Sequence, residues 1–425
     1  MKSSAALAPA LCSASKIVAR IAMGKSFAEE QAALDGAARD SSRAALIDIV
    51  HGTLRRYGRV QAITRRLSAR GRAEPVLESL LWCSIYALES GRYAAYTVVD
   101  QAVQACALLE RWPAKGYVNA VLRGFLRERE SIEKTISEDV EARFQHPAWW
   151  IDALRAGYPA HWLGVLNAGN ARPPMCLRVN RRRISVERYA ERLAAEGVAA
   201  RRVGDEGLIL GEPLPVERLP GFALGEVSVQ DAGAQRVPRL LELAPGQRVL
   251  DACAAPGGKA AHMLEVADVR LTALDADASR CRRIERTLDR LGLAAQVKAA
   301  DCTRLDDWWD GLAFDRVLAD VPCSASGVVR RHPDLKWLRR ATDIQAFAAR
   351  QTTMLDALWQ VLAAGGKLLY VTCSMFPGEN EEVVSAFLAR TPGARRVLLP
   401  DGAPAQWLPD SDHDGFFYAL IEKLA

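Results

Sequence analysis

The C-terminal half of the sequence predicts an α/β fold with a doubly wound, mostly parallel sheet, preceded by an all-helical region and a small α+β module. Three observations predict this organisation. Residues 13–134 repeat apolar side chains at three- and four-residue spacing, as amphipathic helices do. Residues 225–425 alternate strand-like and helix-like segments, which favours βαβ units. Between them lies a short mixed stretch that ends in Pro213, Pro215 and Pro220.

The first region, residues 1–138, is expected to be all-helical. Gly116 is expected to interrupt it, with a new helix opening at Tyr117. Residues 1–140 contain 20 Lys and Arg against 15 Asp and Glu, whereas the rest of the chain balances at 36 of each sign. This surplus equals the formal net charge of +5 and fits a polyanionic partner such as RNA. A solvated helical surface would carry the same charge.

The small α+β module is expected over residues 139–224. A short helix begins at His146, and residues 167–174 read as a loop. A strand over residues 175–180 precedes the run Arg181–Arg183 and a helix that ends at Glu196. Two further short strands are expected, and the three prolines mark a linker to the next domain.

The third domain, residues 225–425, contains the predicted doubly wound sheet. Strands are expected at 248–253, 270–275, 296–301, 314–320 and 367–372, and helices at 258–264, 278–291, 342–362 and 379–389. A final pair of strands, 395–399 and 416–423, would close the sheet. Ligands of such sheets bind beyond the carboxyl ends of the strands.

Length and cysteine usage bound the class of protein. A chain of 425 residues exceeds one ordinary core, so two or three domains are expected. Nine scattered cysteines without CxxC or zinc-type spacing read as reduced thiols in a cytoplasmic protein, with no metal site. No apolar run approaches the roughly 20 residues that span a membrane. The apolar stretch in residues 1–22 is short and broken by serines, so a signal peptide is not expected there. Nothing in the sequence demands more than a monomer.

Acidic residues mark the predicted strand ends. Asp251, Asp275, Asp301 and Asp320 all fall at or near such ends. The turn after the first strand, which contains Gly257 and Gly258, lets a ligand approach the backbone, although it is neither GxGxxG nor a Walker A motif. Acids at these places typically accept hydrogen bonds from ribose hydroxyls or an adenine amino group. The series suggests an adenosine-type ligand without a diphosphate, although each acid alone could be a loop residue or a helix cap.

Two cysteines follow neighbouring predicted strands. Cys323 stands in a loop restricted by Pro322, and Cys373 stands in Thr-Cys-Ser at the end of an apolar strand. A lone cysteine is usually a small buried hydrophobe, but two at one cleft suggest thiolate chemistry on an electrophilic ring. The basic residues Arg330, Arg331 and Lys336 could supply positive potential or hold phosphates there; a solvated basic loop is the alternative.

These segments resemble the RNA cytosine-5 methyltransferases that use S-adenosylmethionine. The matching stretches are 251–259 (DACAAPGGK), 320–337 (DVPCSASGVVRRHPDLKW) and 370–381 (YVTCSMFPGENE), with weaker matches at 225–235 and 414–419. The helical region is similar to the NusB-type RNA-binding domain, through residues 95–106 (AYTVVDQAVQAC) and 116–123 (GYVNAVLR). This combination is typical of the bacterial small-subunit ribosomal RNA methyltransferase B subfamily. Ala260 departs from the threonine frequent in the family.

The resemblance implies a Rossmann-like methyltransferase fold and a role for each site residue. Cys373 would attack C6 of the target cytosine in 16S ribosomal RNA, Asp320 would hydrogen-bond the cytosine edge, and Cys323 would assist proton removal at C5 and release of the product. The residues implied to hold S-adenosylmethionine are Cys253, Ala254, Ala255, Pro256, Gly257, Gly258, Lys259, Asp275, Asp301 and Asp320. The implied substrate is unassembled or partly assembled small-subunit RNA, because the base must leave its stack.

Other functions stay open at the level of sequence. The same chemistry could act on transfer RNA or 23S ribosomal RNA. A DNA methyltransferase would use Cys323 as nucleophile, which the intact Thr-Cys-Ser at Cys373 disfavours. A non-catalytic RNA-binding ribosome-assembly factor would bind cofactor without turnover.

Overall fold

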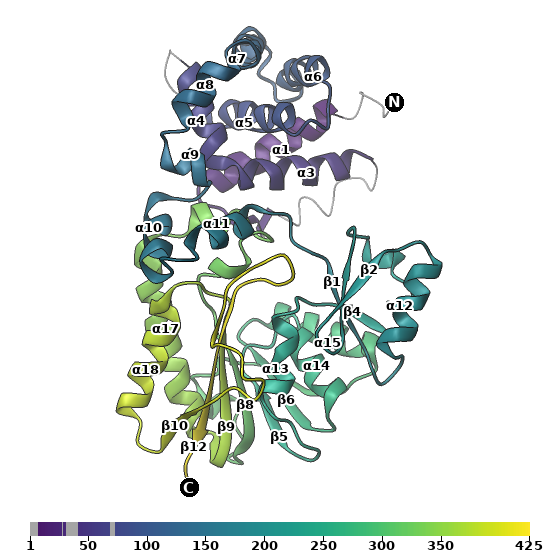
Figure 1. Ribbon diagram of the computed structural model, residues 1–425, viewed down its shortest axis with the longest axis vertical. Coiled ribbons are helices and arrows are strands. Elements are labelled where there is room, and N and C mark those ends of the chain that lie inside the picture. The colour runs from purple at the N-terminus through teal and green to yellow at the C-terminus, as the bar shows by residue number, and fades with distance from the viewer. Residues whose placement is uncertain (1–6, 28, 31–40, 69–72) are drawn as a thin grey trace. The chain divides into compact units, whose positions relative to one another are not determined.

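The computed structural model describes residues 7–27, 29–30, 41–68 and 73–425. Parts of the predicted helical region and of residues 1–22 therefore lie outside the described residues. The chain forms two compact units (Figure 1). The helical unit combines residues 1–171 with Val329–Arg340, and the sheet unit combines Arg172–Val328 with Ala341–Ala425.

The helical unit is built around one helix that is buried on nearly all sides. Its α-helices are α1 (Leu7–Ala22), α3 (Ser41–Arg55), α4 (Tyr57–Leu67), α5 (Pro75–Glu89), α6 (Ala95–Leu108), α7 (Lys115–Arg127), α8 (Arg129–Ile136), α9 (Val140–Phe144), α10 (Ala148–Gly157), α11 (Trp162–Asn170) and α16 (Leu335–Leu338). Helix α5 starts at Pro75, where a backbone amide would have no partner within the helix, so proline loses no hydrogen bond there. A helix that is apolar all round belongs in a core, and α5 accordingly packs against α1, α3, α4, α6 and α7.

The segment Val329–Arg340 reaches the helical unit from a distant part of the chain. Lys336 is fully buried there, and its Nζ donates to the carbonyl oxygens of Gln145 (2.9 Å) and Arg55 (3.3 Å) and to Oδ1 of Asn170 (2.8 Å). Burial lowers the pKa of Lys336 well below its usual value. Asp334 accepts a hydrogen bond from the backbone amide of Phe27.

This burial corrects one interpretation of the sequence. Arg330 and Lys336 do not form an exposed phosphate-binding loop, because both side chains are buried in the helical unit. Two helix boundaries also differ from expectation. Gly116 lies inside the first turn of α7 instead of before it, and α11 extends through residues 167–170, which were predicted as loop. A glycine near a helix start is a weak signal for a helix boundary, and so is a polar stretch without proline.

A small antiparallel sheet in the order β2-β3-β1-β4 forms the middle module. Its strands are β1 (Cys176–Val179), β2 (Ala200–Val203), β3 (Gly207–Leu210) and β4 (Val227–Val229), and helix α12 (Val186–Ala195) packs on it. The prediction missed β4, which is only three residues long. Ser185 caps α12 by accepting from the Arg188 amide.

The main sheet has the order β10-β12-β9-β8-β5-β6-β7, with β11 paired to β12. Its strands are β5 (Arg248–Asp251), β6 (Arg270–Asp275), β7 (Gln296–Ala299), β8 (Phe314–Asp320), β9 (Leu362–Thr372), β10 (Ala394–Val397), β11 (Gln406–Trp407) and β12 (Phe416–Lys423). Strands β9, β8, β5, β6 and β7 are parallel neighbours, and β10, β11 and β12 pair antiparallel. The strand order reverses at β5, because the chain continues to β6 on one side of β5 and later returns to β8 on the other. The carboxyl ends of β5 and β8 are therefore the topological switch point.

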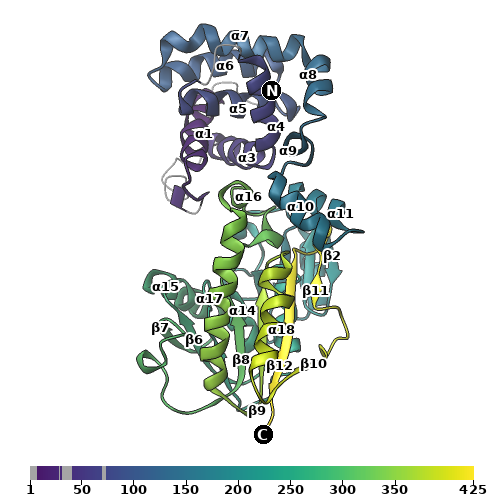
Figure 2. The same ribbon diagram turned by 90° about the vertical axis from the view of Figure 1, so that its left-hand side faces the viewer.

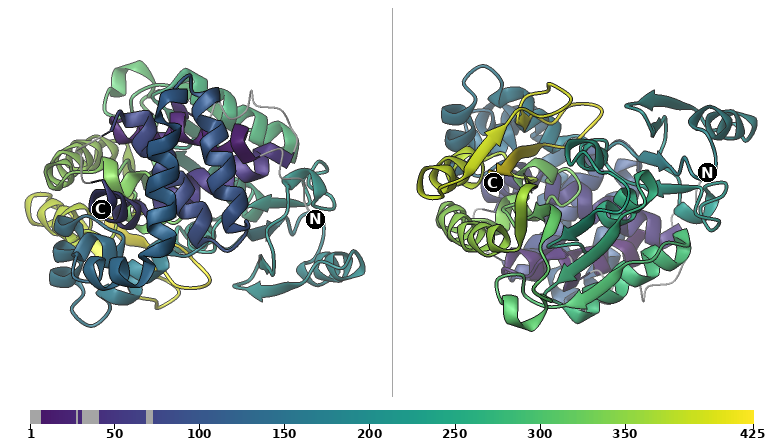
Figure 3. Two further views of the ribbon diagram at one scale, coloured as in Figure 1. Left: turned by 90° about the horizontal axis from the view of Figure 1, so that it is seen from above. Right: turned by 90° about the horizontal axis from the view of Figure 1, so that it is seen from below.

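Helices cover both faces of this sheet (Figures 2 and 3). The helices are α13 (Val237–Leu240), α14 (Gly258–Val266) and α15 (Ala278–Leu291) on one face, and α17 (Ala341–Gln360) and α18 (Glu381–Arg390) on the other. Helix α15 buries Cys281, Ile284, Leu288 and Leu291 at three- and four-residue spacing. Asp277 caps its start, and Gly292, at φ 66°, ends it. Among the described residues, no helix combines the length and hydrophobicity needed to cross a membrane.

Candidate active site

The predicted site residues gather at the carboxyl edge of the parallel strands. Asp251 ends β5 and lies in register with Leu318 of β8, while Asp320 ends β8 beside Val371 of β9. Asp275 ends β6, and Cys373 directly follows β9. Parallel strands place such residues on one side of the sheet, as predicted.

The two predicted cysteines face each other. Their Sγ atoms are 3.5 Å apart and share a hydrogen bond. This bond and burial raise the pKa of Cys323 well above its usual value. The two loops are also joined through the backbone, because the Gly327 amide donates to the Cys373 carbonyl at 2.8 Å. Cys323 is therefore held as a neutral thiol against Cys373.

A buried carboxylate that sequence reasoning missed ties the cysteine loops together. Glu379 accepts from the Ser324 amide (2.7 Å) through Oε1 and from the Ser374 hydroxyl (2.6 Å) through Oε2. The Ser326 hydroxyl, 3.2 Å from that of Ser374, accepts from the Met375 amide. Burial raises the pKa of Glu379. Ser324 and Ser374, which directly follow the two site cysteines, are therefore both hydrogen-bonded to the Glu379 side chain.

The lysine of the glycine-rich loop pairs with the acid of the cysteine loop. Lys259 Nζ lies 2.6 Å from Asp320 Oδ2 and 5.8 Å from the centre of the Phe416 ring. Burial alone would lower the pKa of Lys259, but the Asp320 carboxylate outweighs it and raises that pKa. Lys259 therefore stays charged in a largely enclosed place.

The glycine-rich loop depends on one glycine with a positive φ. Gly257, at φ 99°, precedes α14, and a Cβ there would lie 3.1 Å from the Ile284 backbone. At Gly258 a Cβ would meet nothing nearer than the Gln230 side chain at 3.9 Å. The loop thus leaves open space against its backbone at the start of α14, where a ligand fits.

The remaining predicted site residues occupy separate positions along the edge. Asp275 pairs with Arg280 at 3.2 Å. Asp301 accepts from the Thr303 amide (2.9 Å), which lowers the pKa of Asp301. Cys253 does not face the cysteine pair: a hydrogen bond with the Cys302 thiol is the main cause that raises its pKa.

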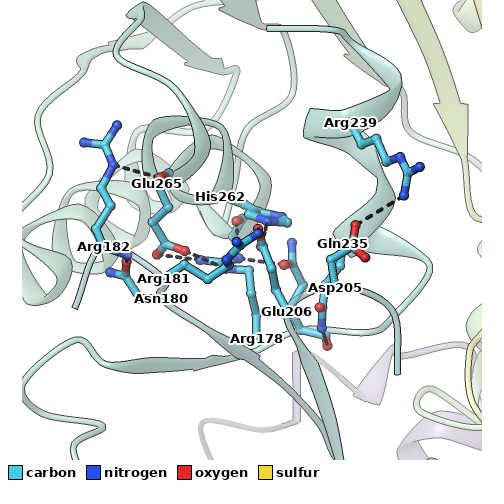
Figure 4. A network of polar contacts seen from close by, with 12 residues as sticks. Arg178, Asn180, Arg181, Arg182, Asp205, Glu206, Gln235, Arg239, His262 and Glu265 are labelled. Atoms are coloured by element: carbon cyan, nitrogen blue, oxygen red, sulfur yellow. Dashed lines mark hydrogen bonds and ion pairs between the residues drawn. The ribbon is translucent and has the colours of Figure 1, made fainter. Parts of the chain in front are cut away.

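A network that sequence reasoning also missed holds the loop from the middle module (Figure 4). Arg178 of β1 is only 1% exposed, and its guanidinium donates to both carboxylate oxygens of Glu265 at 2.9 Å. Its Nη1 also donates to Gln230 Oε1 (2.6 Å) and to the Gly258 carbonyl (2.9 Å). A bidentate arginine pairs with a carboxylate in one defined orientation. Arg178 therefore helps to fix the position of the glycine-rich loop at the start of α14.

The arginine run after β1 has a structural use. Arg182 donates to the Glu265 carbonyl (2.7 Å), and Arg183 donates to the Leu291 carbonyl (2.7 Å). Both carbonyls stand in the last turn of a helix, α14 or α15, where cations stabilise unpaired carbonyl groups. The middle module therefore docks on α14 and α15, which flank the carboxyl edge of the parallel strands.

The carboxyl group of Asp251 is buried, and its pKa is raised. It is 0% exposed, and neither oxygen has a hydrogen bond of standard geometry. Burial, and next the charge of Asp320, raises its pKa from 3.8 to about 8. Between these two values the unfolded chain ionises this group while the folded chain keeps its proton. The contribution of Asp251 to stability is therefore fully present below about pH 4 and is lost as the pH rises through about 8.

We expect Asp251→Asn to flatten the dependence of stability on pH. At pH 8 the variant should melt at a higher temperature than the wild type, and this difference should shrink steadily as the pH falls toward 4. The measurement is thermal unfolding of both proteins between pH 5 and pH 8.5. Parallel curves at all pH values would contradict the raised pKa.

Comparisons with known proteins agree with this architecture. The family model described as 16S rRNA methyltransferase RsmB/F matches residues 238–422. The ferredoxin-like domain model of the RsmF/B-like methyltransferases matches residues 146–217, and the NusB family model matches residues 11–127.

Relatives match along most of the chain. Ribosomal RNA small subunit methyltransferase B of Pseudomonas putida is 44% identical over 391 residues, which are 89% of this chain and 90% of that protein. The protein of the same name from Vibrio cholerae is 39% identical over 418 residues, 96% of each chain. A solved methyltransferase homolog from Pyrococcus horikoshii is 29% identical with a TM-score of 0.60, and covers 67% of this chain and 98% of that one.

A doubly wound sheet with a glycine-rich loop and acids at its switch point defines this chain as an α/β methyltransferase. The matched relatives extend over the helical unit and the middle module as well. The chain belongs to the 16S rRNA methyltransferase RsmB/F family and carries an N-terminal NusB-family domain. It is a ribosomal RNA methyltransferase, and S-adenosylmethionine is its cofactor. The predicted fold class, family and cofactor are thereby confirmed.

Proposed function

We propose that this chain methylates C5 of a cytosine in 16S ribosomal RNA through a covalent bond between Cys373 and C6 of the base. The observation that carries the proposal is the pair of thiols 3.5 Å apart, beside a Lys259–Asp320 ion pair of 2.6 Å. One thiol can form the adduct and the other can assist its resolution, and both lie at the carboxyl edge of the parallel strands.

The residues at this edge fit the cofactor. The loop Cys253–Lys259 would hold its methionine part at the start of α14, where the space at Gly258 admits a ligand. Asp275 and Asp301 would hold the ribose and adenine, and Asp320 would lie near the methionine end. When bound, S-adenosylmethionine supplies a methyl group on a positively charged sulfur, which a carbon nucleophile can take.

Cys373 is the proposed nucleophile. Its thiolate adds to C6 of the cytosine. The electron pair of the C5–C6 double bond is displaced toward C5, which becomes electron-rich. The raised pKa of Cys323 supports this assignment, because the neutral Cys323 thiol can donate its hydrogen bond to a Cys373 thiolate. The charged Lys259 is a further source of positive potential for that thiolate.

Asp320 and Cys323 take the other two proposed roles. Asp320 hydrogen-bonds the cytosine edge and favours protonation at N3, which takes up the charge that develops in the ring. Once C5 carries the methyl group, Cys323 gives its own proton to water and, as a thiolate, takes the C5 proton, while N3 also loses its proton. The electrons of that C–H bond restore the C5–C6 double bond, the bond from C6 to Cys373 Sγ breaks, and the product leaves.

The substrate presents an unpaired cytosine, because the ring must reach Cys373 out of its stack. We therefore propose small-subunit RNA before or during assembly as the substrate. In this proposal residues 1–138 form the main part of the RNA-binding domain, the small sheet β2-β3-β1-β4 is the linking module, and the main sheet with its helices is the catalytic domain. A monomeric state and a cytoplasmic location stay predictions.

The test is methyl transfer from labelled S-adenosylmethionine to unmodified transcripts of 16S ribosomal RNA, 23S ribosomal RNA and transfer RNA. We expect label in the 16S transcript alone, recovered as 5-methylcytosine after digestion to nucleosides and mass spectrometry. Label in one of the other RNAs would replace the proposed substrate. Cofactor binding without label in any RNA would favour a non-catalytic assembly factor.

A further inference from the structure

Helices α6 and α7 of the helical unit lie side by side (Figure 2). Side chains of both helices line a groove between them. We call it the α6–α7 groove. It encloses about 380 Å³ and is lined by Tyr96, Val99, Asp100, Val103, Lys115, Gly116, Asn119 and Arg123. The 3₁₀ turn Trp112–Ala114 joins the two helices at one end of it. A hollow of this size accommodates a small ring system.

Exposed aromatic side chains mark this groove. Among the described residues, Tyr96 at 78% and Trp112 at 48% are the only exposed Phe, Tyr or Trp side chains. Tyr96 lines the groove, and the ammonium of Lys115, which also lines it, lies 4.1 Å from the centre of the Trp112 ring. A large aromatic ring gains free energy when it is covered, so two of them at one place indicate a surface that a partner covers.

The charges at the groove suit an anion with hydrogen-bonding rings. Neither Lys115 nor Arg123 has an ion pair among the described residues, and Arg123 donates to the Asn119 side chain at 3.0 Å. The one acid of the lining, Asp100, accepts hydrogen bonds from the side chains of Gln101 (3.0 Å) and Gln104 (2.8 Å). Two unpaired cations beside exposed rings are the combination that holds phosphates and stacks bases.

We propose that the α6–α7 groove binds a single-stranded segment of the substrate RNA, with bases stacked on Tyr96 and Trp112 and phosphates held by Lys115 and Arg123. The inference rests on the proposed function only in taking ribosomal RNA as the substrate. Single-stranded RNA is favoured over a duplex, because paired bases do not offer their faces for stacking. It is favoured over an apolar peptide because both cations stand at the rim without carboxylate partners.

Three full-length variants test this assignment. Tyr96→Ala with Trp112→Ala removes the stacking surfaces, and Lys115→Gln with Arg123→Gln removes the cations. Gly116→Trp fills the groove instead: a Cβ at Gly116 meets no atom within 4 Å, so the ring can project into open space without disturbing the core. The matched control is Arg129→Gln with Lys134→Gln, which removes the same charge from exposed positions on α8 of the same unit.

We expect the aromatic variant to raise the Kd for unmodified 16S ribosomal RNA by roughly 10- to 100-fold, as loss of stacking does at other single-strand sites. Gly116→Trp should also raise it. The cation variant should lower the slope of log Kd against log salt by about 1 to 2, and the control should change it less. The Kd for S-adenosylmethionine and kcat at saturating RNA should match the wild type in all of them.

The outcome separates this inference from the proposed function. Normal RNA affinity in the aromatic and groove-filling variants would overturn the groove as an RNA site, even while the wild type methylates 16S ribosomal RNA. If the wild type neither binds nor methylates that RNA, the proposed substrate fails first. Circular dichroism and melting temperatures close to the wild type would show that each variant is folded.

Discussion

Cys373→Ala is expected to abolish methyl transfer and to form no covalent complex with RNA. Cys323→Ala should also lose turnover, but it should accumulate a protein–RNA adduct that survives denaturation. The reason is the proposed division of roles: Cys373 forms the bond to C6, whereas Cys323 acts only after methylation. Removing a nucleophile typically costs on the order of 10⁴-fold or more in rate, so both losses lie far outside assay error.

The measurement combines filter binding of labelled methyl groups with denaturing electrophoresis of the protein after incubation with 16S ribosomal RNA and cofactor. Cys106→Ala is the matched control, because it removes a buried thiol of the helical unit and should keep full turnover. An adduct with Cys373→Ala and none with Cys323→Ala would reverse the two roles. The same result would favour the alternative in which Cys323 is the nucleophile.

Asp320→Asn is expected to lower kcat by roughly 10²- to 10³-fold, the usual cost of losing a group that stabilises developing charge. The asparagine keeps the size of the side chain but removes the charge that the ring protonation at N3 needs. It also leaves Lys259 enclosed without its 2.6 Å partner, which lowers the pKa of Lys259 and weakens the positive potential near Cys373.

Asp315→Asn on the same strand provides the control. Asp315 stands near the opposite end of β8, where its carboxylate accepts from the Arg248 amide at 2.7 Å, and its loss should change kcat little. Steady-state kinetics with 16S ribosomal RNA, together with the yield of adduct, would compare the two. Equal kcat values for both variants would show that Asp320 has no part in the chemistry.

The predicted alternation of strands and helices was enough to find the sheet and the edge that carries the acids and cysteines. The period-two and 3.6-residue patterns are local, and parallel strands bring their carboxyl ends together whatever the intervening sequence. The antiparallel strands β4 and β11 were missed because two or three residues carry no pattern.

The residues that hold the site could not be found in this way. Glu379 and Arg178 act through partners far away in the sequence: Glu379 accepts from Ser324, and Arg178 donates to Glu265. In a single sequence a buried, paired charge looks the same as an exposed one. Arg330 and Lys336 show the opposite error, since a stretch that looks suited to phosphates or to solvent buries both side chains in the helical unit instead.

The route of the chain through the segment Val329–Arg340 has a practical consequence for dissecting this enzyme. Because the helical unit is discontinuous, no single cut separates it from the other unit. A fragment that starts at Arg172 would retain Lys336 but lose Arg55, Gln145 and Asn170, which supply its three hydrogen-bond acceptors. A buried ammonium without acceptors is costly. An isolated catalytic fragment should therefore be designed with residues 329–340 replaced by a short polar linker, and a helical fragment should carry that segment grafted after its own C-terminus.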